Sequence, residues 1–179
     1  MVSPLSALVV MGVSGCGKSS VGAAIEALSG GRLIEGDSFH PAANIKKMSA
    51  GIPLDDDDRA GWLQRLGEEL ATAVKQGERP ILTCSALKKR YRDTLRAAVP
   101  ELGFVFLELN PDDAAYRVSH RPGHFMPATL IDSQFAALES PTGEQLTLTV
   151  DATHPVPQLA EEVDAWLIRQ GAKTRTQTA

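Results

Sequence analysis

Cysteine is scarce in this sequence. Its 179 residues include two cysteines, Cys16 and Cys84, which lie far apart and outside any CxxC pattern. This number and spacing disfavour both a disulfide scaffold and a zinc site. We therefore expect a protein of the reducing cytoplasm.

Long hydrophobic runs and an excess of positive charge are also missing. No stretch reaches the roughly 18 apolar residues of a membrane span. The apolar run near the N-terminus has no basic segment before it and ends in a glycine-rich turn, so we expect a strand there, not a signal peptide, and no membrane partner. The 18 basic residues are outnumbered by 22 acidic ones, and the net charge of −4 disfavours nucleic acid as a partner.

What the sequence does contain is typical of a globular domain. Hydrophobic residues make up 43% of the chain and charged residues 22%, and the chain is long enough to bury a core. We expect a single domain over residues 1–171 and a disordered polar tail over residues 172–179.

Short apolar runs alternate with longer helical patterns along the chain. The expected strands cover residues 7–11, 32–35, 80–84, 104–109 and 146–150. The expected helices cover residues 18–28, 56–76, 88–99, 112–120, 127–138 and 156–170. This alternation implies right-handed crossovers and an α/β fold, in which helices cover both faces of a five-stranded parallel sheet.

The segment GVSGCGKS, residues 12–19, matches the full GxxxxGK[ST] pattern of a phosphate-binding loop. It follows the first expected strand and opens the first expected helix, which is the context that the motif requires. Glycine lets backbone N–H groups converge on phosphate oxygens, and the helix N-terminus adds partial positive charge. The sequence therefore predicts a bound nucleoside triphosphate, with Lys18 at the outer phosphates and the Ser19 hydroxyl on Mg²⁺. We expect the nucleotide to contact Gly12, Val13, Ser14, Gly15, Cys16, Gly17, Lys18, Ser19 and Ser20.

GTPases and kinases both use this loop. A GTPase needs a DxxG segment after a strand and an NKxD segment, but here DRAG opens an expected helix and NKxD is absent. A kinase for a small acceptor places polar groups at the carboxyl ends of the strands, and Asp37 directly follows the second expected strand. Asp37 could accept a proton from the attacking hydroxyl or aim that hydroxyl. The competing interpretation makes Asp37 the N-cap of a helix after Pro41.

Four adjacent aspartates, residues 55–58, precede a helical pattern of apolar residues that starts at Trp62. Asp55 or Asp56 is expected to cap this helix and the others to meet its positive end, so most of the run is structural. Arg59 shares the inward face of the helix, and we expect it to point into a cleft and to recognise a ligand.

Two basic clusters follow. After the third expected strand, Lys88 and Arg92 lie one helical turn apart beside an apolar stripe, where Lys88 either contacts ligand or belongs to a solvated face. In RVSHRPGHFM, Arg117 and Arg121 lie one turn apart before a Pro-Gly break. A basic segment with such a break is typical of a lid that closes over phosphates, here about residues 117–127.

Four longer segments carry a resemblance to a known family. They are MGVSGCGKSS, GDSFHPAANIKKMSAGIPLDDDDRAGWL, CSALKKRYRDTLR and GHFMPATLIDSQFAALESP. Together they closely resemble the gluconokinases, which are small P-loop kinases. The resemblance implies a three-layer P-loop kinase fold with a mobile lid, like that of nucleoside monophosphate and shikimate kinases. It also implies a homodimer that transfers the γ-phosphoryl group of ATP to the 6-hydroxyl of D-gluconate, giving 6-phospho-D-gluconate and ADP.

The same resemblance assigns individual residues. Lys18, Asp37 and Arg121 would be catalytic, and Arg117 would belong to the lid over ATP. The acceptor or the transferred phosphate would be surrounded by Asp37, His40, Arg59, Lys88, Arg92, Arg121, His124 and Gln134. Glu35 stands where similar proteins often have aspartate, and the third expected strand ends without an acidic residue. Glu35 or Asp37 is therefore expected to be the second Mg²⁺ ligand.

Two alternatives to a gluconokinase stay open. A shikimate-type or other sugar-acid kinase would share the loop and the basic cleft, whereas an ATP-binding module without transfer would act through partners. Intact Lys18, Ser19, Asp37 and Arg59 favour a catalyst, and a turnover assay separates these possibilities.

Overall fold

The computed structural model describes residues 5–120, 128–172 and 174. The strands are β1 (Ala7–Met11), β2 (Arg32–Glu35), β3 (Pro80–Thr83), β4 (Leu102–Glu108) and β5 (Thr147–Asp151). The helices are α1 (Lys18–Ser29), α2 (Ala42–Ser49), α3 (Asp56–Lys75), α4 (Lys89–Ala98), α5 (Pro111–Ser119), α6 (Ala128–Ala137) and α7 (Val156–Arg169), with a single 3₁₀ turn, η1 (Gly36–Phe39), among the described elements.

All five strands pair in parallel, in the order β2-β3-β1-β4-β5. β1 lies between β3 and β4, so the strands that follow it in the chain lie first on one side of it and then on the other. The loop after β1 therefore sits at the point where the strand order reverses, which is where ligands bind in open α/β sheets. The predicted α/β fold with a five-stranded parallel sheet is confirmed.

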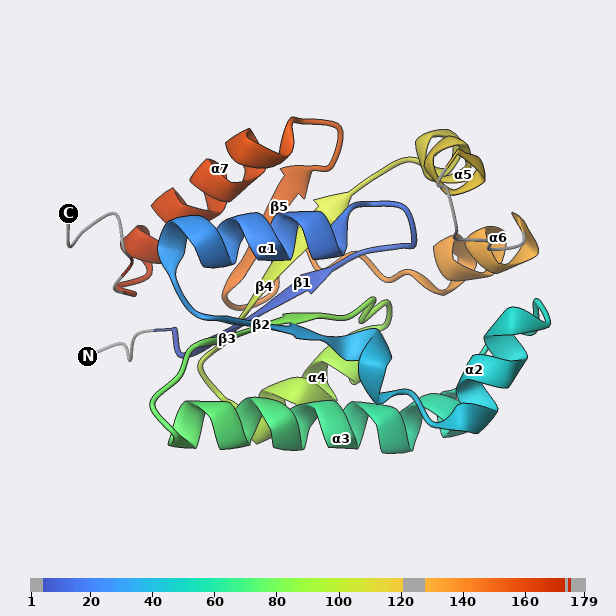
Figure 1. Ribbon diagram of the computed structural model, residues 1–179, viewed down its shortest axis with the longest axis horizontal. Helices are drawn as coiled ribbons and strands as arrows, with labels where there is room; N and C mark the ends of the chain where they lie inside the picture. Colours follow the sequence, from blue (N-terminus) through green and yellow to red (C-terminus); the bar gives the residue numbers. More distant parts are fainter. Residues whose placement is uncertain (1–4, 121–127, 173, 175–179) are drawn as a thin grey trace.

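The sheet is the middle of three layers (Figure 1), with α1 and α7 on one face and α3 and α4 on the other. Side chains of β1 alternate between the two cores, because successive residues of a strand point to opposite faces. Leu8 and Val10 pack in the core under α1 and α7, whereas Val9 and Met11 pack in the core over α3 and α4. Helices α2, α5 and α6 gather at the carboxyl end of the sheet (Figure 1), and they surround the site described below.

The expected strands and helices agree with the structure to within two residues at their ends. Two elements, η1 and α2, are absent from the expected set. α2 has no apolar stripe that would signal a helix, since Asn44 is its buried residue and Ile45 is 50% exposed. It begins after Pro41, and the Asp37 side chain does not cap it, so the competing interpretation of Asp37 as its N-cap is wrong.

Both cysteines are free and buried. Burial raises the pKa of the Cys84 thiol to about 12, so this thiol stays protonated and packs as a small apolar group. In the part of the chain that the structure describes, no helix combines the length and the apolar character that crossing a membrane requires.

Candidate active site

The loop between β1 and α1 has the shape of a phosphate cradle. Gly15 and Gly17 have φ angles of 86° and 93°, in the left-handed region that glycine adopts without strain. Gly15 also lets α5 approach closely, because a Cβ there would lie 3.0 Å from Cγ2 of Val118 and 3.1 Å from the Ala114 carbonyl oxygen. α1 starts directly after Gly17, so the free N–H groups of its first turn adjoin the loop.

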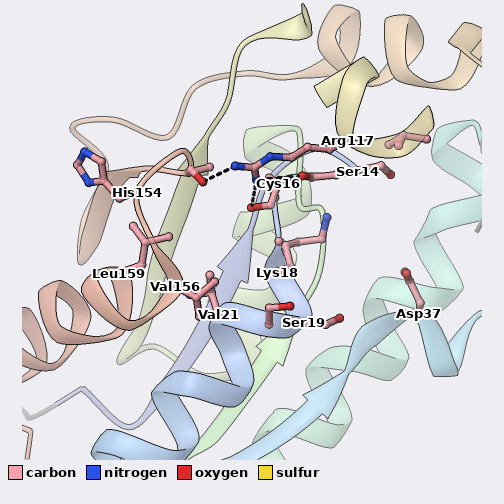
Figure 2. A pocket seen from close by; sticks show the side chains of 15 residues that line it. Ser14, Cys16, Lys18, Ser19, Val21, Asp37, Arg117, His154, Val156 and Leu159 are labelled. Carbon is pink, nitrogen blue, oxygen red and sulfur yellow. Dashed lines mark hydrogen bonds between the residues drawn. The ribbon is translucent and has the colours of Figure 1, made fainter. Parts of the chain in front are cut away.

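A cavity of about 590 Å³ opens over this loop (Figure 2). It is lined by Ser14, Gly15, Cys16, Gly17, Lys18, Ser19, Ser20, Val21, Asp37, Arg117, Val118, Ala152, His154, Val156 and Leu159. The Lys18 ammonium donates hydrogen bonds to the carbonyl oxygens of Gly12 and Val13, at 2.9 and 3.2 Å. The structure thus brings the predicted loop residues from Ser14 to Ser20 together around one space.

Arg117 connects the loop to the segment between β5 and α7. Its guanidinium donates to the Gly15 carbonyl at 3.3 Å and to the Ala152 carbonyl at 2.9 Å. In Figure 2, Arg117 lies over the loop, with His154 and Leu159 toward one side and Asp37 on the opposite side. The cavity therefore extends from Asp37 at one end to the start of α7 at the other.

The hydroxyl of Ser19 is part of a small oxygen-rich cluster. It donates to Oε2 of Glu35 at 3.0 Å, and the same carboxylate oxygen accepts from the Thr83 hydroxyl at 2.7 Å. Hydroxyl and carboxylate oxygens are the ligands that suit Mg²⁺. Among the described residues, no group of three or more His, Cys, Asp and Glu side chains is placed to hold a metal ion.

A second cavity, of about 90 Å³, adjoins the first. It is lined by Ser14, Lys18, Asp37, His40, Met48, Pro53, Leu54, Arg59, Trp62, Ser85, Leu87, Ser133 and Gln134. Three of these residues, Ser14, Lys18 and Asp37, also line the larger cavity. The two spaces therefore meet at the phosphate loop and at the one carboxylate that both share.

His40 is held in a defined orientation in the wall of the smaller cavity. Its ring stacks on Trp62 with 4.0 Å between centroids, and Nδ2 of Asn44 lies 3.3 Å from its Nδ1. Because an amide nitrogen donates, Nδ1 accepts and the proton sits on Nε2, which faces Oδ1 of Asp37 at 3.7 Å. Burial lowers the pKa of His40, and nearby Asp37 only partly opposes this.

The acidic run divides into separate roles. Asp55 caps α3 by accepting from the backbone N–H of Asp58, whose carboxylate accepts in return from the Asp55 N–H. The predicted cap is thus confirmed at Asp55. Asp56 instead reaches α4, where it accepts hydrogen bonds from Tyr91, Lys88 and Arg90.

Arg59 lies in the wall of the smaller cavity, as the helical pattern predicts. Its guanidinium donates from Nη1 to the Tyr91 hydroxyl at 3.1 Å and lies 5.3 Å from the centre of that ring. Lys88 is near the same ring but forms an ion pair with Asp56 at 3.3 Å. Lys88 does not line either cavity.

Arg92 is located differently from the prediction. Its side chain is fully buried and donates to the carbonyls of Ala86, Leu87 and Glu139 and to both carboxylate oxygens of Glu144. All of its donor directions are thereby used inside the protein, and the cavity-lining residue among its partners is Leu87, which it contacts at the carbonyl. We correct the expectation of substrate contact: in this structure Arg92 joins the start of α4 to the segment before β5.

Gln134 reaches the phosphate loop from α6. Its Oε1 accepts from the Ser14 backbone N–H at 2.7 Å, and its Nε2 donates to the Ser14 hydroxyl at 2.9 Å. Gln134 thus lines the smaller cavity and holds the residue that both cavities share. Two predicted residues, Arg121 and His124, lie outside the described residues, as does most of the expected lid.

Several residues of the site were not anticipated. Trp62 was expected only as a core residue, yet its indole N–H donates to the Gly36 carbonyl at 2.9 Å and positions η1. In the sequence, Thr83 has the pattern of a buried strand position and Tyr91 that of a buried helix position. In the structure, the Thr83 hydroxyl donates to the Glu35 carboxylate and the Tyr91 hydroxyl to the Asp56 carboxylate. Tyr91 and Asp56 are 35 residues apart in the sequence, so no local signal pairs them.

No protein-family model matches the chain, but individual known proteins are similar to it over most of its length. It is 43% identical over 155 residues to the thermosensitive gluconokinase of Escherichia coli (strain K12), covering 86% of this chain and 83% of the relative. It is 44% identical over 155 residues to the gluconokinase of Gluconobacter oxydans (strain 621H), covering 86% of this chain and 87% of that one.

Solved structures give the same picture. A gluconokinase from Sinorhizobium meliloti 1021 superposes with a TM-score of 0.84 at 48% identity, over 93% of this chain and 94% of that chain. The APS kinase CysC of Mycobacterium tuberculosis, solved in complex with AMPPNP and APS, superposes with a TM-score of 0.67 at 21% identity, over 93% of this chain and 99% of that chain. The second likeness supports the fold alone.

Proposed function

Because the chain belongs to the gluconokinase family, we propose that its larger cavity binds ATP and its smaller cavity binds D-gluconate. The protein is an ATP-dependent kinase that transfers the γ-phosphoryl group of ATP to the 6-hydroxyl of D-gluconate, giving 6-phospho-D-gluconate and ADP. The observation that carries the assignment of the cavities is their junction at Ser14, Lys18 and Asp37, since transfer requires donor and acceptor to meet in line.

On the donor side, the phosphate loop and Lys18 bind the outer phosphates. The glycine backbone supplies converging N–H groups, and the Lys18 ammonium supplies mobile positive charge where charge builds up during transfer. The base and ribose extend toward Arg117 and the start of α7.

 The apolar side chains of Val156 and Leu159 line that end of the cavity and suit the flat faces of a purine.

The residues beside Ser19 fit the Mg²⁺ ion that kinase chemistry implies. We propose that Ser19 holds the ion directly and that Glu35, which contacts the Ser19 hydroxyl, supports it. When bound, the ion neutralises charge on the β- and γ-phosphate oxygens. Thr83 keeps the Glu35 carboxylate turned toward Ser19 through its own hydrogen bond.

On the acceptor side, Asp37 is placed to orient the 6-hydroxyl and to accept its proton. The Nε2–H of His40 lies 3.7 Å from Oδ1 of Asp37. Arg59, which lines the same cavity, binds the carboxylate of gluconate, for which a guanidinium offers two parallel hydrogen bonds. The homodimer and the contacts of Arg121 and His124 stay predictions from the resemblance, and the cytoplasmic location stays a prediction from the scarcity of cysteine.

A coupled assay of ADP release with gluconate, glucose and shikimate as acceptors tests this proposal. We expect rapid release with gluconate and little with glucose, which lacks the carboxylate that Arg59 would bind. Phosphorylation of shikimate in preference to gluconate would support the alternative sugar-acid kinase. ATP binding without ADP release for any acceptor would support the non-catalytic module.

A further inference from the structure

Arg59 is held by an uncharged group, although carboxylates lie close by. Among the described residues, the Tyr91 hydroxyl is the partner to which the Arg59 side chain donates a hydrogen bond, at 3.1 Å. The guanidinium also lies 5.3 Å from the centre of the Tyr91 ring, within the range of a cation–π contact. Both contacts come from one residue of α4, across the interface between α3 and α4.

The direction of the hydrogen bonds at Tyr91 is determined by its two neighbours. The hydroxyl donates its proton to Oδ1 of Asp56, so its lone pairs are left to accept from Arg59. Asp56 is itself held by Lys88 and Arg90. The result is a chain of two hydrogen bonds that runs from Asp56 through Tyr91 to Arg59.

Charge explains why the intermediate hydroxyl matters. The hydrogen bond from Tyr91 lowers the pKa of Asp56, against the opposing effect of burial, and Lys88 and Arg90 lower it further. Asp56 is therefore ionised at neutral pH, and it strengthens the hydroxyl as an acceptor without pairing directly with Arg59. Among the described residues, the guanidinium uses Nη1 for Tyr91, which leaves its other N–H donors to bind an anion in the smaller cavity.

A free arginine side chain has many rotamers, and fixing them on ligand binding weakens the affinity. Tyr91 is only 4% exposed, so its ring and hydroxyl provide a rigid support. We propose that Tyr91 and Asp56 are positioning residues that pre-orient Arg59 toward the carboxylate of the acceptor. This inference rests on the proposed acceptor site and extends it to α4.

Tyr91→Phe tests the inference, because it removes the hydroxyl and keeps the ring. We expect the KM for gluconate to rise about threefold to thirtyfold, which corresponds to the loss of one hydrogen bond. The KM for ATP should change less than about twofold. Asp56→Asn, which removes the charge, should shift the same constant in the same direction. Tyr116→Phe is the matched control, since Tyr116 is 64% exposed and does not line either cavity.

A double-mutant cycle separates positioning from general support of the fold. If Tyr91 acts through Arg59, the double variant Tyr91→Phe/Arg59→Ala should have the same kcat/KM for gluconate as Arg59→Ala alone. Additive losses, or equal losses for gluconate and ATP, would show a merely structural role and overturn the inference. An unchanged gluconate KM in both Tyr91→Phe and Asp56→Asn would overturn it as well.

The same measurements distinguish a failure of the inference from a failure of the proposed function. A wild-type protein that phosphorylates gluconate while both variants keep its KM would contradict the positioning role alone. A wild-type protein that does not phosphorylate gluconate would contradict the acceptor assignment and the positioning role together. Thermal melting of each variant by circular dichroism checks that the fold is retained.

Discussion

At the scale of single residues, the site depends on side chains that line both the larger and the smaller cavity. Ser14, Lys18 and Asp37 line both cavities, and each offers a different chemistry. The Ser14 hydroxyl and amide are held by Gln134, Lys18 carries mobile positive charge, and Asp37 carries an exposed carboxylate. Donor and acceptor can therefore be aligned by groups that border both cavities, of which Ser14 is held in place by Gln134.

Lys18→Ala should reduce kcat about a hundredfold to a thousandfold, the usual cost of removing a group that stabilises transition-state charge. The fold should persist, because the Lys18 ammonium donates to two loop carbonyls and lies in a cavity wall, outside the core. Steady-state kinetics and a thermal melt measure the two effects. A folded variant with near wild-type turnover would contradict the assignment of the loop.

His40 should make stability depend on pH. Its pKa in the folded protein lies below its ordinary value of 6.5, chiefly because of burial, so the unfolded chain binds a proton more readily than the folded one. Stability from neutral His40 is present above pH 6.5 and is lost as the pH falls from there toward the folded pKa. In His40→Gln, the free energy of unfolding should fall less between pH 7.5 and pH 5.5 than in the wild type.

Urea titrations at both pH values measure this difference. His120→Gln is the control, because that side chain is exposed at the C-cap of α5. An identical slope for wild type and His40→Gln would contradict the account of the buried imidazole.

At the scale of elements, the four aspartates at the start of α3 make different structural contacts. Asp55 and Asp58 close a reciprocal cap, Asp56 ties α3 to α4, and Lys47 of α2 donates to Asp58. The same few residues thus fix the start of α3, which carries Arg59, and join α3 to α2 and α4. The run supports the acceptor site without touching the acceptor.

Asp55→Ala should lower the free energy of unfolding by about 0.5–2 kcal/mol, the usual cost of losing an N-cap. Asp57→Ala is the matched control, because Asp57 is exposed and lies in the same turn outside the capping box. Urea denaturation should therefore show a larger loss for Asp55 than for Asp57. Equal losses would mean that helix-dipole charge, and not the cap, stabilises the start of α3.

The buried ion network at α4 is the second test at this scale. Arg92 and Arg96 both bond to Glu144; burial alone would raise the pKa of Glu144, but these two arginines lower it overall. Arg92→Met leaves that buried carboxylate short of a partner and should cost about 3 kcal/mol of stability. At a temperature where the variant is folded, its KM for gluconate should stay within about twofold of wild type, because Arg92 does not line either cavity and contacts the lining residue Leu87 at its backbone carbonyl.

Lys89→Met, on the exposed face of α4, is the control and should change stability by less than about 0.5 kcal/mol. Denaturant titration and steady-state kinetics together decide the role. An Arg92→Met variant of wild-type stability but with a raised gluconate KM would restore the role that the resemblance gave to Arg92.

At the scale of the whole molecule, the sheet, the phosphate loop and the three layers follow from patterns in the sequence. The apolar run of β1 and the glycines of the loop are local, so they can be identified from a few adjacent residues. The buried position of Arg92 cannot be read in this way, because it depends on Glu139 and Glu144, which are about fifty residues away in the sequence. A basic residue beside an apolar stripe gives the same signal whether it faces a cleft or a buried carboxylate.

The helix α2 and the stacked pair of His40 and Trp62 escaped prediction for a related reason. α2 buries an amide where a helical pattern would need an apolar residue, and Trp62 gives the signal of an ordinary core position. Their contribution arises only when η1, α2 and α3 pack together at the carboxyl end of the sheet. The arrangement of side chains at the carboxyl end of the sheet depends on long-range packing. The strands and helices of the three layers, in contrast, follow from local sequence patterns.

The central claim is that donor and acceptor occupy two cavities that meet at the phosphate loop, and the fluorescence of Trp62 tests it most directly. The chain has two tryptophans, so Trp166→Phe leaves Trp62, in the wall of the smaller cavity, as the only reporter. Gluconate should change its emission in a saturable way, glucose should not, and a non-hydrolysable ATP analogue should have a smaller effect. A variant that still phosphorylates gluconate but shows no change in Trp62 emission at saturating gluconate would contradict the account.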